Sequence, residues 1–239
     1  MGDMRLIRNI LAFLVACLLI LLLFLPVAVV SGLLGRDEFI YSTSRFVIRI
    51  ALGILGVRAV VRGLDSAAFA ASPVIICNHL SNLDGPLLVS ILPVDPRVLI
   101  KAEARKIPLI GWIMKLADFV FVDRSSALHR QAALNEAIAK IREKRYSFLV
   151  FPEGTRSRSG VPQDFKKGSF VMAQRAGVPV LPVRVTGTYR LLPPGRKTCS
   201  RGTVEVDFFP LVNLGDTAES GLPGLVKDLQ QKIYKEANT

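Results

Sequence analysis

An uncharged stretch from Asn9 to Gly35, rich in Leu, Val, Ile and Phe and preceded by Arg5 and Arg8, sets the first limit on how this chain can fold. Such a run is long enough to cross a hydrocarbon core of about 30 Å. It exceeds the ~7–15 apolar residues of a secretory signal and no small-residue cleavage site follows, which favours a membrane helix over a signal peptide. Pro26 leaves two forms open, a straight helix or a helix to about Leu25 followed by a bend.

A second apolar segment, Phe39 to Val61, carries arginines spaced four apart, Arg45 with Arg49 and Arg58 with Arg62. On a helix this spacing places each pair on one face. We expect a basic amphipathic helix in the membrane interface, with its arginines toward lipid phosphates. Because arginines flank the first apolar segment on both sides, they do not orient it, and a true span or two helices dipping into one leaflet both fit.

The rest of the chain alternates short apolar runs with longer amphipathic runs, which is the pattern of an α/β domain. Strands are expected in 73–77, 97–101, 119–122, 147–151, 178–185 and 202–209, and helices in 87–92, 125–145, 165–176 and 221–237. No helix separates the last two strands, which predicts an antiparallel or mixed edge. We therefore predict membrane-embedded or interfacial helices over 1–61, and over 62–239 one α/β domain with a mixed sheet flanked by helices.

The positive net charge of the chain indicates a partner that carries negative charge. The net charge is +12 and the pI about 10.1, which favours nucleic acid, anionic lipid headgroups or a phosphorylated substrate. The positive charge is spread along the chain, without the dense basic stripe and interleaved aromatic residues of most nucleic-acid binders, so no nucleic-acid partner is expected.

Three scattered cysteines, Cys17, Cys77 and Cys199, give neither a disulfide framework nor a zinc-ligand spacing. This fits a reducing compartment, and no metal is expected because the carboxylates form no ligand cluster. Cys77 lies two residues before His79 and would share a strand face with it if the strand continues that far. A thiol nucleophile is the rival interpretation, but we expect Cys77 to be a packed core residue.

The first motif with catalytic chemistry is the polar turn from Asn78 to Asp84, between a buried strand and a helix. The carboxyl end of a strand is where α/β proteins place their chemistry. A histidine has an unperturbed pKa near ~6.5, so His79 is suited to act as a general base, with Asp84 holding its tautomer. The two side chains would point about 140° apart on a regular helix, and they meet only if the turn is non-helical.

The second motif, Glu153-Gly154-Thr155-Arg156, directly follows the strand expected at 147–151. It combines a glycine-permissive turn, a hydroxyl, backbone N–H groups and a guanidinium, which together make a small phosphate or carboxylate site. Glu153 is unexpected beside an anion, and we expect it either to orient Arg156 or to accept a hydrogen bond from a substrate hydroxyl.

Together the two motifs, Asn78-His79-x-x-x-x-Asp84 and Phe151-Pro152-Glu153-Gly154-Thr155-Arg156-Ser157, resemble those of the glycerolipid acyltransferase family, in particular lysophosphatidic acid acyltransferases. The segments Lys101 to Arg124 and Val178 to Val183 look like two further family blocks. The resemblance covers roughly residues 62–215, and the apolar N-terminus is similar to that of bacterial members.

The resemblance implies a glycerolipid acyltransferase-like αβ domain with an N-terminal hydrophobic helical membrane anchor. It implies transfer of a fatty acyl group from acyl-CoA or acyl-carrier protein to the hydroxyl of 1-acyl-sn-glycerol 3-phosphate, giving phosphatidic acid, on the cytoplasmic side of the inner membrane. His79 would be the general base oriented by Asp84, with no acyl-enzyme and no cofactor beyond the thioester co-substrate. The acceptor would be held by Arg124, Glu153, Gly154, Thr155 and Arg156.

Three alternatives remain open. The acceptor could be another lyso-lipid, such as a lyso-aminolipid or a different lysophospholipid. A lipid hydrolase using Cys77 or a serine is a second class, disfavoured because the chain has no Gly-x-Ser-x-Gly elbow. A non-enzymatic binder of anionic membranes or nucleic acid rests on charge alone and predicts steeply salt-dependent binding.

Overall fold

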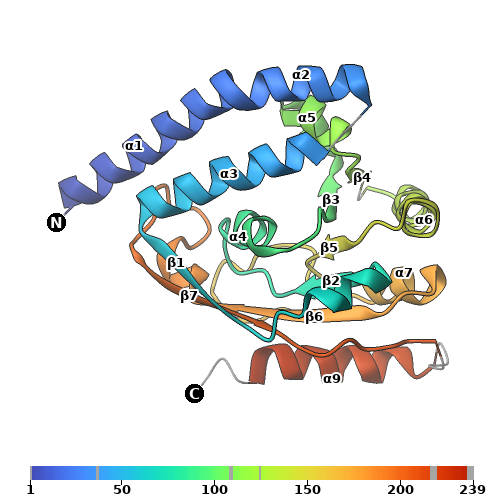
Figure 1. Cartoon of the computed structure of the whole chain (residues 1–239). Coiled ribbons are helices and arrows are strands. Elements are labelled where there is room, and N and C mark those ends of the chain that lie inside the picture. Colours follow the sequence, from blue (N-terminus) through green and yellow to red (C-terminus); the bar gives the residue numbers. More distant parts are fainter. Residues whose placement is uncertain (1, 36–37, 108–109, 124, 216–219, 236–239) are drawn as a thin grey trace.

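The computed structural model describes residues 2–35, 38–107, 110–123, 125–215 and 220–235. Within these residues a seven-stranded sheet runs in the order β1-β7-β6-β2-β5-β3-β4 (Figure 1). Its strands are Val57–Arg62 (β1), Val74–Cys77 (β2), Arg97–Lys101 (β3), Val120–Val122 (β4), Phe148–Val150 (β5), Val180–Thr186 (β6) and Gly202–Phe208 (β7). All neighbours are parallel except β6 and β7. The predicted mixed sheet is confirmed.

Helices cover both faces of this sheet. The helices are α1 (Gly2–Leu19), α2 (Leu25–Leu34), α3 (Glu38–Leu55), α4 (Asp84–Ile91), α5 (Ile110–Leu116), α6 (Ala127–Lys144), α7 (Gly168–Ala176), α8 (Thr188–Leu191) and α9 (Leu222–Lys235). Residues of α3 and α4 form one apolar core with the sheet, and residues of α6, α7 and α9 form a second. Figure 1 shows α3 and α4 above the sheet and α9 below it.

Strand β2 lies in the middle of the sheet, and its side chains alternate between the two cores. Ile75 and Cys77 pack with α3 and α4, whereas Val74 and Ile76 pack with α6, α7 and α9. All four residues are fully buried. A strand buried on both faces needs a continuous apolar run, which is what the sequence has here. The turn carrying His79 therefore starts from the best-protected strand of the sheet.

The N-terminal segment stays helical past its proline. A π-helical turn, Ile20–Phe24 (η1), joins α1 to α2, and Pro26 occupies the first turn of α2. Proline lacks an N–H donor, and a widened turn before it accommodates the lost hydrogen bond. The helical segment ends where Gly35 takes a left-handed conformation, so of the two forms left open the helix does not stop at Leu25 but runs on to Leu34. By length and composition Met4–Leu34 is able to cross a membrane.

The start of α1 is fastened to a distant loop of the α/β domain. The Asn9 side chain accepts a hydrogen bond from the Cys199 N–H at 2.7 Å and donates to the Cys199 carbonyl at 3.0 Å. Arg8 donates to the same carbonyl at 2.6 Å. Farther along, Gly32 of α2 packs against Leu116 of α5, and α3 lies beside both α1 and α2.

The single helix predicted over Phe39 to Val61 is wrong in its last part. Helix α3 ends at Leu55, and Val57–Arg62 forms strand β1, so the sheet begins before residue 62. The strand pairs with β7, where Arg62 binds the neighbouring carboxylates of Glu205 and Asp207. β7 is consequently not the edge strand that the sequence suggested, because β1 covers it.

Arg45 and Arg49 do not face lipid phosphates, contrary to the sequence prediction. Arg49 donates to the Ser90 carbonyl at 2.7 and 3.0 Å, and Arg45 donates to the carbonyls of Val89 and Val94. The Val89 and Ser90 carbonyls lie in the last turn of α4, where a helix has unsatisfied acceptors and partial negative charge, and Val94 follows just after it. The arginines therefore fasten α3 to the helix that follows the His79 turn.

Candidate active site

His79 and Asp84 are brought together by the turn between β2 and α4. His79 Nδ1 lies 3.0 Å from Asp84 Oδ2, and the Asp84 side chain is buried while 19% of the His79 side chain remains exposed. An ionised carboxylate only accepts hydrogen bonds, so Nδ1 carries the proton. Nε2 is then the ring nitrogen with a free lone pair. A histidine held in this way can act as a general base.

The turn is non-helical because Asp84 folds its carboxylate back over it. Oδ2 also accepts the main-chain N–H of Leu80 at 2.8 Å and of Ser81 at 2.7 Å. The Ser81 hydroxyl accepts the Leu83 N–H and donates to the Leu192 carbonyl, both within 3.1 Å. Asp84 thus shapes the turn and contacts the imidazole with the same oxygen.

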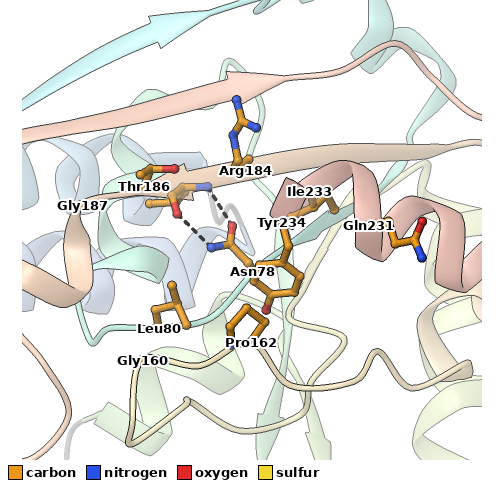
Figure 2. A pocket seen from close by; sticks show the side chains of 11 residues that line it. Asn78, Leu80, Gly160, Pro162, Arg184, Thr186, Gly187, Gln231, Ile233 and Tyr234 are labelled. Atoms are coloured by element: carbon orange, nitrogen blue, oxygen red, sulfur yellow. Dashed lines mark hydrogen bonds between the residues drawn. The ribbon is translucent and has the colours of Figure 1, made fainter. Parts of the chain in front are cut away.

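Asn78 attaches this turn to the sheet. Its amide donates to the Val185 carbonyl and accepts the Val185 N–H, each at 2.8 Å, which adds a side-chain rung between β2 and β6 (Figure 2). On the other side, the His79 ring stacks on Phe151 with centroids 3.9 Å apart. The sequence motifs contain both residues, but neither the Val185 contact nor the stacking could be read from them.

The second motif lies against the first. Gly154 has φ +76°, a conformation that favours glycine and turns the chain back toward His79. The Ser157 N–H donates to the His79 carbonyl at 3.3 Å, and Arg156 donates to the side chain of Asn82. The two turns are therefore joined through main chain and side chain, and the guanidinium lies on the turn that carries the histidine.

Glu153 points inward and does not orient Arg156. It is 2% exposed, and its Oε1 accepts the His79 N–H at 2.8 Å and the Tyr234 hydroxyl at 2.6 Å. Burial raises the pKa of Glu153, and the hydrogen bonds from Tyr234 and His79 act in the opposite direction. Tyr234 comes from α9, and nothing in the sequence indicated that this helix reaches the turn.

Exposed polar and basic groups surround the glycine turn. Thr155 is exposed, and a side chain at Gly154 would meet the Lys166 ammonium at 3.0 Å, so a second cation lies beside the turn. Arg124, expected to bind the acceptor, lies outside the described residues. A cavity of about 610 Å³ is lined by Asn78 and Leu80 of the His79 turn and by residues of β6, α9 and the 160–162 loop (Figure 2).

Cys77 and His129 are separate from this arrangement. Cys77 is fully buried in the core, and burial raises the pKa of its thiol well above the usual value. His129 of α6 forms a second histidine–aspartate pair with Asp123, which follows β4, at 2.9 Å, but both side chains of that pair are exposed. The thiol therefore lacks both the access and the ionisation that a nucleophile needs.

Comparisons with known proteins agree with these motifs. A family model described as "Acyltransferase" matches residues 58–186. The chain is 29% identical to a 1-acyl-sn-glycerol-3-phosphate acyltransferase of Saccharomyces cerevisiae, over 88% of this chain and 73% of that one, and 29% identical to a protein of the same name from Borreliella burgdorferi, over 82% and 78%. The crystal structure of the 1-acyl-sn-glycerophosphate (LPA) acyltransferase PlsC from Thermotoga maritima matches with a TM-score of 0.78 and 30% identity, over 98% of both chains. Helix α9 lies beyond the residues that the family model matches.

Proposed function

The chain belongs to the acyltransferase family, and we propose that it transfers a fatty acyl group from acyl-CoA or acyl-carrier protein to 1-acyl-sn-glycerol 3-phosphate, giving phosphatidic acid. The relatives carry the name of this activity. The observation that carries the proposal is the His79–Asp84 pair at 3.0 Å beside a turn with Arg156 and the exposed Thr155. A base next to an anion site suits an alcohol that is attached to a phosphate.

In the proposed mechanism His79 Nε2 takes the proton of the acceptor hydroxyl as its oxygen attacks the thioester carbonyl. Asp84, bonded to Nδ1, stabilises the imidazolium that forms. The tetrahedral intermediate then collapses, the carbon–sulfur bond breaks, and the thiolate receives the proton from Nε2. No acyl-enzyme is needed, which agrees with the burial of Cys77.

Acceptor binding is assigned to the glycine turn. A phosphate prefers guanidinium donors, which Arg156 supplies, and the exposed Thr155 beside it carries a hydroxyl that can donate as well. Lys166 adds positive charge at the same place. Arg124 stays a proposed contributor from the sequence motif.

We assign the enzyme to the cytoplasmic membrane, with the site on the cytoplasmic side, where its thioester donors are found. The support is the apolar surface that α1 and α2 leave uncovered. Leu11, Phe13, Leu14, Leu21, Leu22 and Leu33 are each more than half exposed. An apolar face of this size marks a surface that contacts lipid or protein.

The test is a screen of acyl donors and lysophospholipid acceptors with purified protein in lipid vesicles, using a radiolabelled acyl chain. We expect transfer to 1-acyl-sn-glycerol 3-phosphate and a loss of about 10³-fold or more in His79→Ala. His129→Ala is the matched control, because it removes the other aspartate-paired histidine, and it should retain the wild-type rate. Full activity of His79→Ala would contradict the mechanism, and a strong preference for an acceptor without phosphate would contradict the assigned substrate.

A further inference from the structure

The hydroxyl of Tyr234 and the main-chain N–H of His79 meet on one oxygen of a buried carboxylate. Glu153 Oε1 accepts both, at 2.6 Å from Tyr234 and 2.8 Å from His79, and within the described residues Glu153 Oε2 has no hydrogen-bond partner. The carboxylate is therefore held through a single oxygen by two donors. One donor belongs to α9, and the other to the residue proposed as the general base.

Tyr234 is itself held firmly in place. It lies near the end of α9, whose Val226, Leu229 and Ile233 are buried against the sheet. Its ring packs on Phe165 with centroids 5.7 Å apart, and Figure 2 shows it extending from α9 toward the loop at Pro162. Burial raises the pKa of the Tyr234 hydroxyl, so this group stays protonated and can only donate to Glu153 at neutral pH.

The consequence for His79 follows from its main-chain contacts. Its N–H is fixed by Glu153 and its carbonyl by the Ser157 N–H, whereas the ring is fixed by Asp84 and Phe151. Without Tyr234, Glu153 keeps one donor and is free to rotate or to take up a proton. A displaced Glu153 would release the His79 N–H and shift the imidazole relative to Asp84.

We propose that Tyr234 is a positioning residue, which by donating to Glu153 Oε1 keeps the carboxylate bound to the main-chain N–H of His79 and so keeps the imidazole in its reactive orientation. This assignment rests on the proposed function of His79 as general base. The alternative is that Tyr234 only stabilises the packing of α9 on the core. The positioning role and the structural role predict different values of kcat, and a different pH dependence of kcat, in a variant without the hydroxyl.

The test is Tyr234→Phe, with Tyr41→Phe as the matched control. Tyr41 also has a buried hydroxyl with two acceptors, the carbonyls of Pro96 and Ala117 at 3.1 and 3.2 Å, but it lies on α3, away from the His79 turn. We expect Tyr234→Phe to lower kcat by about tenfold or more, with the acceptor KM within about twofold of wild type. Each substitution removes one hydrogen-bonded hydroxyl, so Tyr41→Phe should lower Tm about as much as Tyr234→Phe does. Unlike Tyr234→Phe, it should leave kcat unchanged.

The pH dependence of kcat distinguishes a positioning role of Tyr234 from a purely structural contact between α9 and the core, because loss of a structural contact would leave that pH dependence unchanged. The Tyr234 hydrogen bond lowers the pKa of Glu153, so its removal raises that pKa further and Glu153 becomes protonated at a higher pH. A protonated Glu153 holds the His79 N–H less strongly, so the loss of kcat on the acid side should begin at a higher pH in Tyr234→Phe and stay in place in Tyr41→Phe. Glu153→Ala combined with Tyr234→Phe should lose no more activity than Glu153→Ala alone, because removing the carboxylate already removes the acceptor of the Tyr234 hydrogen bond.

Unchanged kcat and an unmoved acid limb in Tyr234→Phe would overturn the assignment, as would fully additive losses in the double variant. These outcomes are distinct from failure of the proposed function. If His79→Ala retains full activity the general-base mechanism fails, whereas an inactive His79→Ala with a normal Tyr234→Phe rejects only the role of Tyr234.

Discussion

Replacing Asp84 by asparagine separates its two roles, because one oxygen of this side chain serves both. Oδ2 accepts the main-chain N–H groups of Leu80 and Ser81 and also holds His79 Nδ1. An amide oxygen in the same position can still accept all three bonds. It lacks the negative charge that stabilises an imidazolium.

The expected changes in stability and in kcat can be estimated from these three hydrogen bonds. Charge-assisted hydrogen bonds contribute about 1.5–3 kcal/mol and neutral ones about 0.5–1.5 kcal/mol. With two main-chain bonds weakened, Asp84→Asn should lower the free energy of unfolding by about 2 kcal/mol. Asp84→Ala leaves the Leu80 and Ser81 N–H groups without an acceptor at about 1–3 kcal/mol each, a loss of roughly 2–6 kcal/mol. Both variants should lower kcat by about 10²- to 10⁴-fold, as expected when a histidine loses its carboxylate.

The assay combines steady-state acyl transfer with urea unfolding of the same preparations. Asp118→Asn is the control, since Asp118 pairs with Lys140 and Lys144 of α6 and has a left-handed backbone that asparagine tolerates. Burial raises the pKa of Asp118, but the bonds from both lysines outweigh it and hold that pKa below its ordinary value. Its contribution to stability is therefore present above the ordinary pKa and disappears on acidification, without an effect on kcat. An Asp84→Asn enzyme with wild-type kcat would refute the reasoning.

Two further substitutions test the acceptor site and the thiol. Arg156→Ala should raise the KM for a phosphorylated acceptor about tenfold or more with a smaller effect on kcat, and an unchanged KM would indicate that the phosphate binds elsewhere. Cys77→Ala should keep kcat within about twofold of wild type. It should lower the free energy of unfolding by about 1 kcal/mol, because it leaves a small cavity in the core. Loss of acyl transfer without loss of stability would instead support a thiol nucleophile.

Much of the α/β domain could be predicted because its strands and helices have clear periodicity. The run from Pro73 to Cys77 is apolar throughout, and the buried strand β2 lies there. Strand β1 was missed because Arg58 and Arg62 have a spacing that fits one face of a helix equally well. Only the pairing with β7, from the other end of the chain, makes that segment a strand.

The environment of the site was less predictable than its residues. The short spacing of His79 and Asp84 already suggested a contact, because a non-helical turn is a local property. The partner of Glu153 is 81 residues away on α9, and no periodicity links the two. Arg45 and Arg49 were assigned to lipid for the same reason, since sequence shows that a helix face is basic but not which acceptors lie opposite it.

Asn9 and Arg8 bind the Cys199 backbone and α2 packs on α5, so the N-terminal helices are attached to the α/β domain at two separate places. Their outward apolar side chains are therefore connected to the His79 turn through the α/β domain. In the membrane-bound state that we propose, these two attachments would set the distance between the His79 imidazole and the lipid headgroups.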